Sequence, residues 1–185
     1  MLQNATYSNN FDGKRILTRK ISQKDLRNVK KFQVFINSLV KENVKILMDE
    51  RVSLKEEKKW LRGLLQRVKK GEEVYLLADF NDEIVGTAVV ELGAHRQSHI
   101  GNFTISIKDG YRGIGLGTYI AKAIIKLAKK ELKPKPKIIK LTVFPGNKSA
   151  LALYKELGFR KVARIPKQLQ YKGKLEDEIV MLLDL

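Results

Sequence analysis

Cysteine is absent from this 185-residue chain, and histidine occurs only twice. The lack of cysteine excludes disulfide bonds, thiolate catalysis and cysteine metal sites. His95 and His99 are four residues apart in an expected turn and strand, and a metal ion needs more ligands than these two. We therefore expect two surface histidines and no metal site.

Long apolar runs are also missing. No segment approaches the roughly 18 uncharged apolar residues of a membrane span, and the N-terminus has no apolar core of the signal-peptide kind. We expect a cytoplasmic protein without membrane contact. Its length and its 43% apolar content are typical of one globular domain, which we assign to residues 14–185. The polar residues 1–13 are expected to be disordered.

Acidic residues are few compared with basic ones. The chain has 20 Asp and Glu against 37 Lys and Arg, which gives a formal net charge of +17. A field of this sign attracts polyanions. Residues 122–140 contain eight lysines and a single acid, Glu131. The simpler interpretation is a solvated helix face, and the alternative is a weak contact with nucleic acid or an acidic partner, for which no RNA-binding aromatic motif or zinc finger is visible.

Hydrophobic periodicity predicts an α/β domain. Strands are expected at Arg15–Lys20, Val74–Phe80, Ile84–Leu92, Phe103–Ile107, Ile138–Val143, Phe159–Ile165 and Glu178–Leu183. Helices are expected over Leu26–Leu39, after the capping box Ser53–Glu56, from Leu116 to Leu127 and up to Leu157. Early hairpins followed by strand–helix units predict a mixed sheet with helices on both faces.

Residues 111–117, with the sequence YRGIGLG, stand between an alternating strand and an amphipathic helix. Glycines at a strand-to-helix turn let a ligand approach the backbone closely, and the first turn of a helix has unpaired N–H groups that can bind phosphate oxygens. Gly117 is followed by Thr118, which excludes the phosphate loop of nucleotide hydrolases, and Ile120 stands where a dinucleotide fingerprint needs glycine. The remaining pattern, R-x-x-G-x-G, predicts a diphosphate cradle, with a plain glycine-rich turn as the alternative.

A second motif lies further along the chain. Asn147, Ala150 and Tyr154 are spaced to share one side of a short helix, and the helix-ending pair Gly158-Phe159 follows. The string N-x-x-A-x-x-x-Y-x-x-x-G-F after R-x-x-G-x-G resembles the GNAT family of N-acetyltransferases, most specifically between residues 105 and 159. Within that family, the sequence most resembles the ribosomal-protein alanine acetyltransferases and the amino-acid and small-molecule acetyltransferases. The resemblance implies the GNAT fold, an α/β domain with a mixed, mostly antiparallel sheet of about six to seven strands and helices on both faces.

The resemblance also implies an enzyme that moves an acetyl group from acetyl-CoA to a primary amine by direct attack in a ternary complex. Backbone N–H groups of the cradle would bind the diphosphate of coenzyme A, and Arg112 would add positive charge near it. The edge of the strand at 105–107 would bind the pantetheine arm and help to polarise the thioester carbonyl. The expected cofactor-binding residues are Ile105, Ser106, Ile107, Arg112, Gly113, Ile114, Gly115, Leu116, Gly117, Thr118, Asn147 and Tyr154.

Catalytic roles follow from the same resemblance. Tyr154 is expected to donate a proton to the leaving thiolate, with a plain core tyrosine as the alternative. The sequence departs from the family at the general base, because Thr142 and Asn102 stand at the two positions where relatives carry glutamate. Glu91 is the substitute that we expect and His99 is a second candidate, each with a structural or exposed role as the alternative.

A site without a strong base fits an amine of low pKa. Deprotonating a lysine at pH 7 costs roughly 4.6 kcal/mol, whereas an α-amine costs only about 1.4 kcal/mol. We therefore expect the acceptor to be a peptide N-terminus or a small amino compound. It would lie between the turn at Ile46–Val52, where Asp49 and Glu50 would attract a cation, and the loop at Gln170–Lys174 with Tyr171. A non-catalytic module that binds acetyl-CoA or nucleic acid is the alternative function, and a homodimer stays open.

Overall fold

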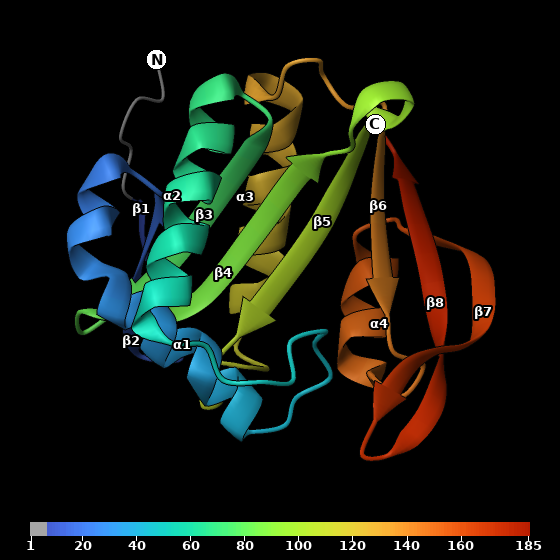
Figure 1. Cartoon of the computed structure of the whole chain (residues 1–185), viewed down its shortest axis with the longest axis horizontal. Coiled ribbons are helices and arrows are strands. Elements are labelled where there is room, and N and C mark those ends of the chain that lie inside the picture. The colour runs from blue at the N-terminus through green and yellow to red at the C-terminus, as the bar shows by residue number, and fades with distance from the viewer. Residues whose placement is uncertain (1–6) are drawn as a thin grey trace.

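The computed structural model describes residues 7–185, which form one twisted sheet flanked by helices (Figure 1). The strands are β1 (Tyr7–Phe11), β2 (Lys14–Lys20), β3 (Glu73–Phe80), β4 (Glu83–Leu92), β5 (Ile100–Ile107), β6 (Ile138–Val143), β7 (Arg160–Tyr171) and β8 (Lys174–Asp184). The helices are α1 (Val29–Lys41), α2 (Leu54–Lys70), α3 (Leu116–Glu131) and α4 (Lys148–Glu156), with short 3₁₀ turns at Gln23–Asn28 and His95–Gln97.

The eight strands lie in the order β1-β2-β3-β4-β5-β6-β8-β7. Among the neighbouring pairs of the described sheet, only β5 and β6 run parallel. The sheet therefore has the mixed, mostly antiparallel form predicted from the sequence, with one strand more than the upper expectation. That strand is β1.

β1 begins inside the segment that we expected to be disordered. Residues 1–6 of that segment lie outside the described part of the chain, whereas residues 7–11 pair antiparallel with β2. The turn between the two strands is Asp12-Gly13, and both residues have positive φ. An Asp-Gly pair at a two-residue turn matches the right-handed twist of its strands, so this dipeptide was an available hairpin signal.

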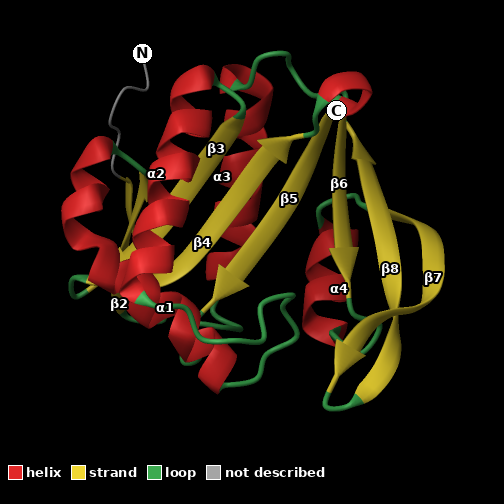
Figure 2. Ribbon diagram, viewed as in Figure 1, coloured by secondary structure: helices red, strands yellow, loops and turns green. Residues whose placement is uncertain are grey.

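Helices cover both faces of the sheet, as predicted, with α1 and α2 on one face and α3 and α4 on the other (Figures 1 and 2). The expected apolar stripe of α3 is buried, with Leu116, Ile120 and Ile124 fully enclosed. On the opposite face, Phe32 of α1 and Leu61 of α2 pack over the sheet. Within residues 7–185, none of the helices is long and apolar enough to span a bilayer.

The feature of the sheet that shapes the site is the divergence of β5 from β6. These strands pair over only three positions, from Ile100 opposite Ile138 to Asn102 opposite Lys140, and then separate (Figure 1). Gly101 lies in this paired stretch, and a Cβ on it would be 2.6 Å from Cγ1 of Val90 on β4 and 2.9 Å from Cδ1 of Ile139 on β6. Beyond this vertex, the edge of β5 facing β6 has no partner strand, and a wedge opens.

Candidate active site

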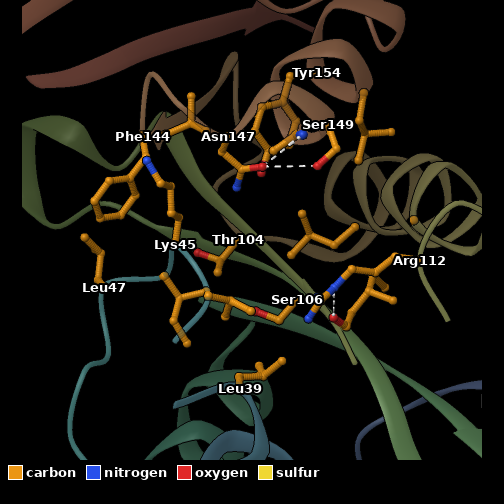
Figure 3. Close-up of a pocket in the computed structure, with 18 of the residues that line it drawn as sticks. Leu39, Lys45, Leu47, Thr104, Ser106, Arg112, Phe144, Asn147, Ser149 and Tyr154 are labelled. Atoms are coloured by element: carbon orange, nitrogen blue, oxygen red, sulfur yellow. Dashed lines mark hydrogen bonds between the residues drawn. The ribbon is translucent and has the colours of Figure 1, made fainter. Parts of the chain in front are cut away.

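A cavity of about 1060 Å³ occupies the wedge between β5 and β6 (Figure 3). Its walls come from the end of α1 and the loop after it, from β5, from the start of α3, and from the end of β6 with α4. The lining residues fall within 36–48, 103–107, 112–118 and 142–156, together with Leu169 and Tyr171 of β7. The fold thus brings the two sequence motifs to one cavity.

The glycine-rich segment forms a turn that leads directly into α3. Gly113 and Gly115 have φ values of +76° and +87°, a backbone conformation that residues with a Cβ rarely adopt. A Cβ built on either glycine meets no heavy atom within 4 Å, so the space outside the turn is open. Within the described residues, the backbone N–H groups of 113–118 donate no hydrogen bond to another backbone group. Free donors at the positive end of a helix dipole suit a diphosphate.

The guanidinium of Arg112 is bound by other groups of the protein. Its Nε donates to the carbonyl oxygen of Ile107 at 2.8 Å, and its Nη2 lies 2.5 Å from a carboxylate oxygen of Glu42 at the end of α1. A further carboxylate, on Asp109, is 3.8 Å from its Nη1. The guanidinium therefore joins the glycine turn to the end of β5 and to α1. Arg112 also lines the cavity, and its expected contribution of positive charge near the diphosphate stays a prediction.

The open edge of β5 continues from this turn. Residues 105–107 pair with Ala88, Thr87 and Gly86 of β4 on one side, and their other side faces the wedge. Backbone groups on that side are free to pair with an extended ligand, in the way that a neighbouring strand would.

The side chain of Tyr154 on α4 forms part of the wall of the cavity (Figure 3). It is 7% exposed and packs edge-on against Phe103, with ring centroids 6.0 Å apart, and against Phe159 at 5.9 Å. Burial raises the pKa of Tyr154 to about 12. The phenol is consequently protonated at neutral pH and can act as a hydrogen-bond donor.

Asn147 caps α4, the structural role that the sequence allowed for it. Its side-chain oxygen accepts from the backbone N–H of Ala150 at 3.3 Å and from the hydroxyl of Ser149 at 3.2 Å (Figure 3). Because the carbonyl side of the amide is used in this way, its NH₂ group remains as a donor at the cavity wall.

Glu91, which we expected to act as the general base, does not reach the cavity. Its carboxylate lies 3.2 Å from Nε of Arg67 on α2, and it is not among the lining residues. The reason is its position in β4, opposite Asn102, where the wedge is still closed. His99 is exposed in the turn before β5 and is also outside the lining. The structure thus corrects the placement of both candidates.

The turn at Ile46–Val52, where we expect the acceptor, lines the cavity in part. Ile46, Leu47 and Met48 line the cavity, as does Tyr171. Asp49 and Glu50 are exposed and are not lining residues, because the chain turns away from the wedge after Met48.

Sequence reasoning missed the contacts that close this side of the cavity. Nζ of Lys45 lies 3.1 Å from the carboxylate of Glu176 in β8 and sits over the rings of Tyr171 and Phe144, at 4.9 and 5.6 Å from their centroids. The hydroxyl of Tyr171 donates to the carbonyl oxygen of Asn43 at 2.8 Å. These contacts join segments about 130 residues apart, and no local pattern in the sequence signals them.

Several solved structures with the same fold are described as acetyltransferases. The chain superposes on a GNAT-family acetyltransferase from Streptococcus pneumoniae with a TM-score of 0.80 at 23% identity, covering 92% of this chain and 99% of that one. For the ribosomal-protein-alanine N-acetyltransferase of Brucella melitensis the TM-score is 0.77 at 22% identity, covering 91% and 99%. For yncA of Salmonella typhimurium, solved with its cofactor acetyl-CoA, it is 0.75 at 18% identity, covering 92% and 94%.

The sequence comparison reaches the same family independently of the fold. No curated protein sequence matches the chain significantly. The sequence profile of the acetyltransferase (GNAT) family matches residues 40–159, which is more than half of the chain and includes the acceptor turn, the glycine turn and α4. The chain therefore belongs to the acetyltransferase (GNAT) family.

Proposed function

We propose that this protein transfers an acetyl group from acetyl-CoA to a primary α-amine, on a peptide N-terminus or a small amino compound. The observation that carries the proposal is the row of unpaired N–H groups at 113–118 beside the open edge of β5, both in one cavity. We assign the activity to the domain of residues 14–185, because the walls of the cavity all come from this range.

The groups at the donor site suit the chemistry of coenzyme A. The diphosphate would lie against the N–H groups that open α3, and each hydrogen bond to a charged acceptor contributes about 1.5–3 kcal/mol. The amide groups of the pantetheine arm would pair with residues 105–107 of β5. Bound acetyl-CoA supplies an acetyl group that is activated as a thioester. The Salmonella neighbour, which holds acetyl-CoA, supports this choice of donor.

Tyr154 is the proton donor in this proposal. Its phenol faces the cavity from α4, and its pKa of about 12 keeps it protonated through the neutral range. A hydrogen bond from this hydroxyl would stabilise negative charge on the leaving sulfur. Asn147 would contact the donor through its free NH₂ group.

The choice of an α-amine rests on the carboxylates that the cavity offers. Among the described lining residues these are Glu42 and Glu156, which pair with Arg112 and Lys122. With no free carboxylate at the wall, the acceptor would lose its proton to water in the open cavity. An α-amine does so at a cost roughly 3 kcal/mol lower than a lysine side chain. The Brucella neighbour, named for an alanine of a ribosomal protein, is in keeping with this class of acceptor.

A panel of amines tests the proposal through release of free thiol from acetyl-CoA. The panel comprises peptides with a free N-terminus and blocked lysines, the same peptides with a blocked N-terminus and one free lysine, and single amino acids. We expect α-amines to react at least about tenfold faster than lysine side chains at pH 7. Equal rates at lysine would contradict the acceptor class, and no thiol release with any amine would contradict the function.

A further inference from the structure

The charge of the chain gathers at the end of the sheet that lies away from the cavity. Three separate segments meet there, because the N–H of Lys133 donates to the carbonyl oxygen of Gly71 at 2.9 Å and the N–H of Lys137 to that of His99 at 2.8 Å. These bonds bring the last turn of α2, the turn before β5, and the end of α3 with its following loop to one edge of the molecule (Figure 1).

Eight exposed cations on these segments form what we call the basic end. They are Lys69, Lys70, Arg96, Lys129, Lys130, Lys133, Lys135 and Lys137. Within residues 7–185, none of the eight makes a salt bridge, although eleven other Lys and Arg side chains do. On the same segments, Glu131 is already paired with Lys20, and Glu73 with Arg67, so Glu72 is the one acid there without a salt bridge among the described residues, against eight cations. The basic end therefore carries positive charge that the protein leaves uncompensated.

The donor does not account for this charge. The basic end is at the C-terminus of α3 and the glycine turn is at its N-terminus, and the 16 residues of the helix span about 24 Å. At physiological ionic strength, a separation of this size is about three Debye lengths, so the lysines contribute little at the diphosphate site.

We propose that the basic end binds the phosphate backbone of duplex nucleic acid. Lysine ammonium groups are point charges that neutralise phosphates without reading bases, and eight exposed cations without salt bridges on one end of the molecule attract a phosphate polyanion. None of the exposed large hydrophobic residues lies on these segments, so the surface lacks the apolar side chains that anchor a protein in a lipid surface. It also lacks exposed aromatic rings for stacking on single-stranded bases.

The test compares two triple variants that have the same net charge as each other, because each loses three cations. Lys133→Gln/Lys135→Gln/Lys137→Gln removes three cations from the basic end, and Lys24→Gln/Arg27→Gln/Lys30→Gln removes three exposed cations from the region before and at the start of α1. Binding to a fluorescent 20-base-pair duplex is measured across salt concentrations, with thermal unfolding and acetyl-CoA binding as checks that both variants fold. Each phosphate contact contributes about −0.9 to the slope of log K against log salt.

We expect the basic-end variant to make the slope shallower by about 2 to 3 and the control variant to change it by less than about 1. RNA and DNA duplexes should bind within a few-fold of each other, and saturating acetyl-CoA should not displace them. Equal losses in both variants, displacement by acetyl-CoA, or a preference for anionic phospholipid vesicles over the duplex would overturn the proposal.

A second measurement on the unaltered protein does not depend on any variant. Chemical modification of lysines, read by mass spectrometry, should show Lys129, Lys133 and Lys135 protected by the duplex, whereas Lys24 and Lys30 remain reactive. Uniform protection, or none, would overturn the proposal. Neither measurement involves acetyl transfer, so its result is independent of the proposed function.

Discussion

Arg112 of the glycine turn and Glu42 at the end of α1 form an ion pair, with a nitrogen–oxygen distance of 2.5 Å across 70 residues of sequence. The same guanidinium holds the carbonyl oxygen of Ile107, where β5 ends. Because one side chain contacts all three segments, the position of the glycine turn relative to β5 depends on this pair.

Glu42→Gln is therefore expected to weaken acetyl-CoA binding about threefold, since the coupling of a contacting pair is on the order of 0.7 kcal/mol here. Arg112→Gln should have a similar effect, and the double variant should be little worse than either single one. Calorimetric titration measures all three. If Glu42→Gln instead tightens binding, the freed guanidinium acts directly on the phosphates.

The two glycines of the motif should respond differently to alanine. Gly115 has a φ of +87°, so Gly115→Ala is strained by roughly 1–2 kcal/mol and should weaken donor binding as the turn relaxes. Gly117 lies in the first turn of α3, and a Cβ there would meet Leu153 at an ordinary 3.7 Å. Gly117→Ala should leave folding intact and keep donor binding within about threefold. Urea unfolding and donor titration of both variants check this contrast, and equal losses in the two would refute it.

Removal of the Tyr154 hydroxyl tests the proton donor. Tyr154→Phe keeps the packing against Phe103 and Phe159, so we expect kcat to fall about 100-fold while the KM for acetyl-CoA stays nearly constant. Tyr119→Phe on α3, outside the cavity lining, is the matched control and should leave kcat unchanged. A wild-type rate for Tyr154→Phe would contradict the role as proton donor and would mean that this tyrosine serves only as a core residue.

Lys45 is expected to act on the acceptor side alone. Lys45→Ala removes the ion pair with Glu176 and the contacts with two aromatic rings, which loosens the wall formed by the α1–α2 loop and β8. We expect the KM for the acceptor to rise several-fold and the dissociation constant for acetyl-CoA to stay the same. Steady-state kinetics with each substrate varied in turn separates the two effects, and a change in donor affinity would contradict the assignment.

Glu57 on α2 should make stability depend on pH. Burial raises its pKa to about 7, whereas glutamate in an unfolded chain titrates near 4.3. Between these two pH values the folded state binds more protons than the unfolded state. The free energy of unfolding therefore decreases as the pH rises from about 4.5 to 7. Glu57→Gln should add about 1 to 3 kcal/mol at pH 8 and almost nothing at pH 4. Urea unfolding at both pH values measures this, with exposed Glu50→Gln as control; the same gain at both pH values would exclude the mechanism.

Local patterns predicted much of the fold because they depend on near neighbours. The capping box of α2 is present, with the N–H of Ser53 donating to Glu56 at 2.7 Å. Gly158 ends the α4 region with a φ of +90°, as a helix C-terminal glycine does. Asn81 and Asp82 both have positive φ in the predicted hairpin turn between β3 and β4. In each case the determining contacts lie within a few residues.

Site residues were predictable to the extent that they belong to such local motifs. The glycine turn and the α4 residues Asn147 and Tyr154 were singled out by their spacing together with the resemblance to the GNAT family, and they line one cavity. Glu91 was chosen by residue type on a neighbouring strand, and the closed vertex of the wedge keeps it outside.

The sequence by itself indicated the order of most elements, the helix start that leaves N–H groups free after residue 112, and the family. All of these depend on residue patterns over short stretches of the chain. The tertiary structure alone decided that Arg112 turns to Glu42, that Lys45 meets Glu176, and that lysine and arginine side chains from three segments gather at one end of the sheet. The physical reason is that charge pairing and charge clustering depend on distance in space, and the sheet and its crossovers bring together residues that the chain holds far apart.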